Sequence, residues 1–129
     1  MSISHNVDQR NTFATSITTA VDGGLGVGNC VLKAGTSVVA TIPLNKPSFG
    51  APAAGIITLV VSPVPEDDDA AGNASVVDSM EFQDSDGTVI FTGSNITAVG
   101  GGGDLELSKN PIAAGDIVQL TSFSYQASP

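Results

Sequence analysis

Short runs of β-branched residues, each closed by glycine or proline, constrain this chain more than any other feature of its sequence. Val, Ile and Thr account for 34 of the 129 residues, and Gly and Pro account for another 22. β-branched side chains favour extended backbone, whereas Gly and Pro favour turns. No run shows a convincing apolar spacing of 3.6 residues, which would indicate an amphipathic helix. The pattern predicts an all-β chain.

The spacing of the turn signals predicts an antiparallel β-sandwich, of which a jelly roll is one form, with about eight short strands and no substantial helix. We expect residues 1–11 to form a flexible N-terminal arm and residues 12–129 to form a single domain. Residues 56–62 are the most apolar run and are the best candidate for a central core strand. The expected strands are residues 12–21, 29–33, 36–44, 56–62, 76–84, 88–92, 104–107 and 117–125.

The clearest local prediction is a hairpin at Asp86-Gly87. This dipeptide lies between two strand-like runs, which is the strongest short-range hairpin signal. Alternation within residues 76–84 places Val76, Met80 and Phe82 on one face, so Met80 and Phe82 should point into the core. Phe82, Phe91 and Phe123 are expected to fill the core. Phe49 lies in a loop rich in Pro and Gly, and two interpretations stay open for it, core packing and an interface anchor.

The charge balance excludes several classes of function. Four basic against 13 acidic residues give a net charge of −9, and there is no basic stripe for nucleic acid.

No apolar run is long enough for a membrane helix, and the first ten residues lack the pattern of a secretory signal, so neither is expected. The one histidine, His5, lies in the expected arm, and histidine-based catalysis has little support there. One cysteine, Cys30, excludes an intrachain disulfide, and we interpret it as a small buried residue.

An acidic run, Glu66 to Asp69, is the one plausible ligand site in the sequence. Asp67, Asp69, Gly72, Ser75 and Asp78 fit positions 1, 3, 6, 9 and 12 of a calcium-loop template. Position 5 is an alanine, position 12 is an aspartate where the template has a glutamate, and the flanks are not helical. A solvated acidic turn is therefore the expectation, with cation binding as the alternative.

Two further patterns are candidates for a catalytic or phosphate-binding site. Glu81 and Glu106 would form an acid–base pair of the kind that hydrolases use, but both are expected on outward strand faces. The glycine-rich residues 23–28 would cradle a phosphate only with a strand before them and a helix after them, whereas a strand-like run follows. A flexible turn is expected. The sequence thus predicts no catalytic, cofactor-binding or metal-binding residue and no cofactor.

The second half of the chain resembles a group of small proteins encoded by tailed bacteriophages. The resemblance covers roughly residues 45–126, and the acidic run and the glycine-rich residues 23–28 depart from it. The motifs that carry it are Pro47-Ser48-Phe49-Gly50, Phe82-x-Asp84-Ser85-Asp86-Gly87-Thr88-Val89, Asp104-Leu105-x-Leu107, Ile112-Ala113-Ala114-Gly115-Asp116 and Val118-x-Leu120-Thr121-Ser122-Phe123-Ser124-Tyr125.

The resemblance implies a virion structural protein without enzyme activity, most similar to capsid cement or decoration proteins. Such proteins sit on the outer capsid surface, often as homotrimers, and clamp neighbouring subunits of the major capsid protein after synthesis in the bacterial cytoplasm. Two alternatives stay open. The chain would be a neck, tail or fibre-base component of the virion, or it would act outside the virion as a β-sandwich ligand-binding module or a minor hydrolase.

Overall fold

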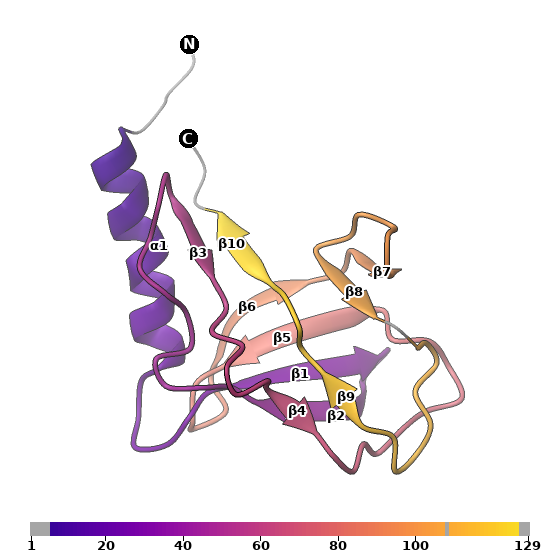
Figure 1. Ribbon diagram of the computed structural model, residues 1–129. Helices are drawn as coiled ribbons and strands as arrows, with labels where there is room; N and C mark the ends of the chain where they lie inside the picture. The colour runs from indigo at the N-terminus through magenta and orange to yellow at the C-terminus, as the bar shows by residue number, and fades with distance from the viewer. Residues whose placement is uncertain (1–5, 108, 127–129) are drawn as a thin grey trace.

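A four-stranded antiparallel sheet forms the base of the fold (Figure 1). The computed structural model describes residues 6–107 and 109–126. The chain is mostly β, as predicted. In spatial order, the strands of this sheet are β2 (Ser37–Pro43), β1 (Asn29–Ala34), β5 (Ser79–Gln83) and β6 (Val89–Gly93).

One of the two central strands of this sheet is β1, which pairs with β2 on one side and β5 on the other. Cys30 and Leu32 of β1 lie opposite Phe82 and Met80 of β5, and all four side chains are buried. The predicted inward direction of Met80 and Phe82 is therefore confirmed. The predicted strand at 76–84 is too long, since β5 begins only at Ser79, and Val76, which the alternation placed on the same face, is 53% exposed.

The predicted hairpin at Asp86-Gly87 joins β5 to β6 and is confirmed. The Asp84 carboxylate accepts hydrogen bonds from the backbone N–H groups of Asp86 (3.0 Å) and Thr88 (2.9 Å). Gly87 has a φ of 86°, a left-handed conformation that glycine adopts without a steric penalty. One side chain and one glycine thus fix the turn.

Six shorter strands form three two-stranded pairs beside and above this sheet (Figure 1). Two pairs are antiparallel, and the pair of β7 with β8 is parallel, which the antiparallel prediction did not include. The pairs are β10 (Ser124–Gln126) with β3 (Ile56–Thr58), β4 (Glu66–Asp67) with β9 (Val118–Gln119), and β7 (Ile96–Ala98) with β8 (Leu105–Leu107).

The segment predicted as a central core strand, residues 56–62, is not one. Only Ile56–Thr58 form a strand, β3, and it pairs with β10 outside the four-stranded sheet. Beyond it the backbone N–H of Leu59 donates to the Phe123 carbonyl, and that of Val60 donates to the Ser48 carbonyl. Ile57 and Leu59 are buried, so the apolar side chains of this segment fill the core without a regular strand.

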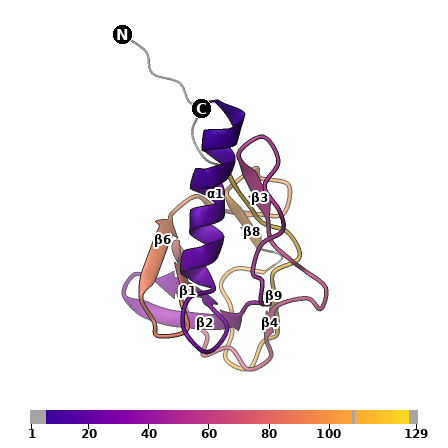
Figure 2. The same cartoon turned by 90° about the vertical axis from the view of Figure 1, so that its left-hand side faces the viewer.

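A 15-residue helix, α1 (Val7–Val21), replaces both the strand predicted at 12–21 and part of the predicted arm. The expectation of no substantial helix is wrong. Asn6 caps the helix by accepting a hydrogen bond from the Gln9 N–H (2.8 Å), and Ala14 and Val21 are buried on one face. Figure 2 shows α1 along one side of the molecule, between β3 and β6. Residues 1–5 of the predicted arm, His5 included, lie outside the described residues.

An aromatic cluster fills the space between the sheet and the C-terminal strands. The Phe82 ring stacks on the rings of Phe91 (centroids 4.6 Å apart) and Phe123 (4.7 Å). Phe82 and Phe123 are buried in the core, as predicted, whereas Phe91 is partly buried and packs against it. Phe49 is 2% exposed, and its ring lies 6.0 Å from that of Phe82. Phe49 therefore packs in the core, and its interpretation as an interface anchor is wrong.

Candidate binding groove

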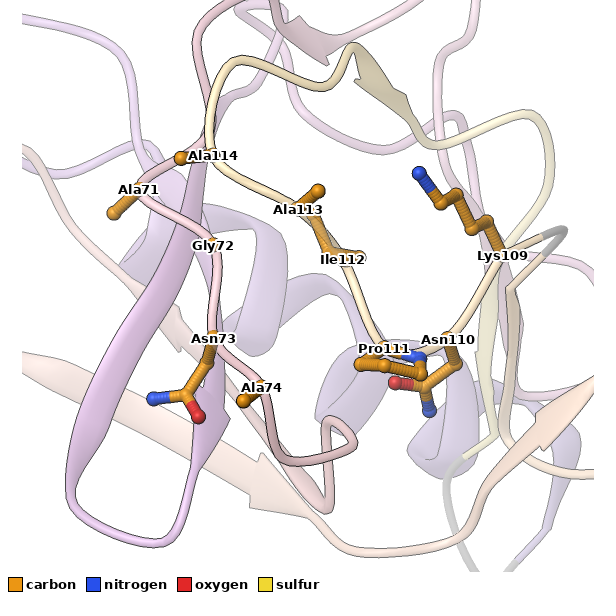
Figure 3. Close-up of a pocket in the computed structure, with 10 residues that line it drawn as sticks. All are labelled: Ala71, Gly72, Asn73, Ala74, Lys109, Asn110, Pro111, Ile112, Ala113 and Ala114. Atoms are coloured by element: carbon orange, nitrogen blue, oxygen red, sulfur yellow. The ribbon is translucent and has the colours of Figure 1, made fainter.

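An open groove of about 730 Å³ runs between residues 71–74 and residues 109–114 (Figure 3). The two segments are far apart in the sequence and lie side by side in the structure. Most of the lining is small apolar side chains and backbone, with the Lys109 side chain at one end of the second segment. The lining residues are Ala71, Gly72, Asn73, Ala74, Lys109, Asn110, Pro111, Ile112, Ala113 and Ala114.

The two walls of the groove touch through their backbones. The Asn73 N–H donates to the Ile112 carbonyl (2.8 Å), and the Gly115 N–H donates to the Ala70 carbonyl (2.8 Å). A Cβ atom on Gly72 would lie 2.2 Å from the backbone nitrogen of Ala114, a distance that real atoms do not tolerate. The absence of a side chain at Gly72 therefore allows the walls to approach this closely.

Two polar side chains brace the wall formed by residues 109–114. The Asn110 amide accepts from the Val77 N–H (2.8 Å) and donates to the Val77 carbonyl (3.3 Å). The Asp116 carboxylate accepts from the Lys109 ammonium (2.7 Å) and the Ala113 N–H (2.9 Å). These two bonds lower the pKa of Asp116, with the Lys109 bond the larger cause. Both side chains thus hold the groove wall in position. The mostly apolar lining of the groove suits contact with another apolar surface.

The acidic run does not form the calcium site that the template allowed. Asp67 lies in β4 and accepts bonds from the Thr41 N–H (2.9 Å) and the Asp69 N–H (3.0 Å). Asp78 accepts a bond from the Gly35 N–H instead, and Gly72 lies in the groove. Within residues 6–107 and 109–126, no group of three or more His, Cys, Asp or Glu side chains could hold a metal ion.

The structure does not bring Glu81 and Glu106 together as an acid–base pair. Glu81 on β5 forms an ion pair with Lys33 (3.0 Å) and accepts a bond from Gln83 (2.9 Å). These bonds, that of Lys33 first, lower the pKa of Glu81, whereas a general acid needs a raised pKa. Glu106 on β8 accepts a bond from the Gly102 N–H (2.9 Å). Each carboxylate thus has its own structural role.

Cys30 is a buried core residue, as predicted. It is completely buried on β1, and desolvation raises the pKa of its thiol to about 12. A thiol with such a pKa is protonated at neutral pH and is a poor nucleophile.

The glycine-rich residues 23–28 follow helix α1 and precede strand β1, the reverse of the order in a phosphate loop. The interpretation as a turn is confirmed. The Lys46 ammonium holds this turn by donating to the carbonyls of Gly24 (3.2 Å) and Gly26 (3.3 Å). Between them the Leu25 side chain is fully exposed. The sequence did not single out Leu25, since an apolar residue among glycines does not reveal its direction.

The sequence does not predict the groove either. Both of its walls are rich in alanine, but that signal reports only small side chains and not their proximity. No helix among the described residues combines the length and apolar character that a membrane crossing requires. Comparison of the chain with models of protein families, with curated proteins and with solved structures found no match.

Proposed function

We propose that this chain is a non-enzymatic structural protein of a tailed-bacteriophage virion, and specifically a cement or decoration protein on the outer capsid surface. In this proposal the strands pack as a β-sandwich, copies associate as a homotrimer, and the partner is the major capsid protein. The resemblance of residues 45–126 to small phage proteins supports it, and so does the groove between residues 71–74 and 109–114.

The groove is the observation that carries the proposal. It is open, small side chains line it, and backbone hydrogen bonds and the Asp116 carboxylate hold its shape. A preformed apolar surface loses little entropy on binding, which suits contact with a large, rigid partner. Residues 112–114, the first three of the motif Ile112 to Asp116 that carries part of the resemblance, line this surface.

The side chains that could act as catalytic acids, bases or nucleophiles add support, because each one is paired, hydrogen-bonded or buried within the fold. Glu81 is paired with Lys33, Glu106 holds the turn at Gly102, and Cys30 is buried. A net charge of −9 favours solubility of a particle that is densely coated with such copies. Copies that bind only the assembled capsid would stabilise it by mass action.

The decisive experiment is the copy number of this chain in purified particles, measured by quantitative mass spectrometry against the major capsid protein. We expect a ratio near one or a simple fraction of one, and we expect particles without this chain to release their DNA at a lower temperature. A ratio of a few per cent would contradict the cement role and assign the chain to the neck, tail or fibre base. Absence from the particles would overturn the virion role altogether.

A variant in the groove tests whether this surface makes the contact. Ala113→Glu places a charge on the groove wall at an exposed position, and we expect it to lower the copy number per particle. Ala51→Glu makes the same change at an exposed alanine outside the groove and is the matched control. Equal occupancy of both variants would show that the groove is not the contact surface.

A further inference from the structure

The two edges of the four-stranded sheet are treated differently by the rest of the chain. The outer edge of β2 is covered, since Thr41 donates its N–H to the Asp67 carboxylate and the Val39 carbonyl accepts from the Gly72 N–H. The outer edge of β6 is not. Within the described residues, no hydrogen bond joins Val89–Gly93 to any segment other than its partner strand β5. Helix α1 also lies near β6.

The composition of β6 gives this edge no protection. Its five residues, Val-Ile-Phe-Thr-Gly, include no charge and no proline, the residues that usually discourage another strand from pairing. Val89 and Thr92 are exposed. An extended segment can therefore reach the unpaired backbone groups of β6.

A pocket adjoins the C-terminal half of β6. Its volume is about 390 Å³, and it lies between β6 and β10, with the Asp104 carboxylate among its lining groups. In strand addition, main-chain bonds provide affinity and pockets for alternate side chains provide specificity. This pocket would receive one side chain of an added strand. The lining residues are Met80, Phe91, Thr92, Gly93, Asp104, Phe123, Ser124, Tyr125 and Gln126.

The charges around β6 select among possible partners. Asp84 and Asp86 lie in the turn that precedes this strand, and Asp104 lies at the pocket near its end. Carboxylates thus lie near both ends of this uncharged strand, and the whole chain carries a net charge of −9. A second copy would bring the same negative charge, whereas a basic segment would be attracted.

We propose that the outer edge of β6 binds an extended, lysine- or arginine-bearing segment of a partner protein by antiparallel strand addition. The main chain of that segment pairs with Val89–Gly93, and a basic side chain enters the pocket beside Asp104. The binding mode follows from the geometry of β6 and does not depend on the capsid role.

The test uses a capped synthetic peptide in which lysine and valine alternate. Hydrogen exchange of the full chain is measured with and without the peptide. At a peptide concentration about ten times its Kd we expect about tenfold slower exchange at those amides of residues 89–93 that point away from β5. A peptide of alternating glutamate and valine, and a lysine–valine peptide with N-methylated backbone, should give no such protection.

Two double variants test the role of the flanking carboxylates. Asp86→Asn with Asp104→Asn should weaken binding of the lysine–valine peptide about fivefold. Asp68→Asn with Asp69→Asn removes the same charge from exposed positions in the segment beside β2 and should leave binding nearly unchanged.

Three results would overturn the proposal. The first is unchanged exchange at residues 89–93 in the presence of the peptide, and the second is equal weakening by both double variants. The third is protection of these amides in the protein alone that grows with its concentration, which would make a second copy the occupant. None of these results bears on the copy number in particles, so failure here is distinct from failure of the proposed function.

Discussion

The hairpin of β5 and β6 and the groove wall at residues 109–114 satisfy their backbone hydrogen-bonding groups in different ways. In the hairpin, a ladder between paired strands satisfies the backbone, and Phe82 packs beneath it. No described residue of the groove wall lies in a strand, so single bonds hold it. The Ile112 carbonyl accepts from the Asn73 N–H, and the Ala113 N–H donates to the Asp116 carboxylate. The Asn110 amide ties the wall to the backbone of Val77. Packing therefore dominates the stability of the first region, whereas individual polar contacts and close backbone approach dominate that of the second.

Removal of the central ring should have the largest effect. Phe82→Ala leaves a cavity among Phe49, Phe91 and Phe123, and we expect a loss of about 3–5 kcal/mol in the free energy of unfolding. Urea unfolding followed by circular dichroism measures this loss. Phe82→Leu, with an expected loss of about 1.5 kcal/mol, keeps the test possible if the alanine variant does not fold. Leu25→Ala, at a fully exposed position, should change stability by less than about 0.5 kcal/mol.

Close backbone approach is the second test. Gly72→Ala combines a positive φ of 74° with a clash against Ala114, and we expect a loss of about 3 kcal/mol. Gly115→Ala is the matched control. Its φ is 84°, but nothing lies within 4 Å of the added Cβ, so the strain alone should cost about 1 kcal/mol. Equal losses in urea unfolding would show that the groove walls can separate at little cost.

The side-chain brace should have an intermediate effect. Asn110→Ala leaves the N–H and carbonyl of Val77 without their partner, and we expect a loss of about 1–2 kcal/mol. Hydrogen exchange should accelerate at Val77 and remain unchanged at Leu32 in the centre of the sheet. Faster exchange at both sites would mean that the groove wall and the sheet unfold together, and the contrast between the two regions would fail.

The smallest effect concerns the ion pair on the sheet. Lys33 lowers the pKa of Glu81 in the folded chain. Near that pKa the unfolded state therefore binds more protons than the folded state, so this ion pair stabilises the fold at neutral pH and loses its effect as the pH falls. Lys33→Met should therefore cost up to about 1 kcal/mol at pH 7, and this cost should shrink below the ordinary glutamate pKa of about 4.3. Lys46→Met removes bonds to carbonyls, and its cost should not depend on Glu81. Urea unfolding at pH 7 and pH 3 compares the two variants.

Local signals explain which parts of the fold the sequence could predict. Asp86-Gly87 and the alternation of Met80 with Phe82 act within a few residues, so their structure follows from the local chemistry. Val76 shows the limit of this argument. Its predicted direction assumed a continuous strand from residue 76. Instead the Asn110 side chain, distant in the sequence, bonds the backbone of Val77 in an irregular segment, and Val77 is the buried residue of the two.

The helix and the groove lay beyond sequence reasoning for different reasons. Helix α1 is rich in threonine, a weak helix former, and tertiary contacts at Ala14 and Val21 override that propensity. The groove depends on the meeting of two segments distant in the sequence, at Gly72 and Ala114. No local pattern reports such a meeting. The engagement of Glu81 by Lys33, in contrast, needed only the pairing of β1 with β5, which places the two residues on neighbouring strands.

The burial of Cys30 makes its thiol a probe of how often the strand that holds it opens. This thiol is the one cysteine of the chain and is completely enclosed on a central strand. A thiol reagent can modify it only when that strand is transiently released, so the modification rate at high reagent concentration equals the rate of opening. Because the chain holds no other sulfhydryl, uptake of the reagent by the protein reports the opening of this one strand.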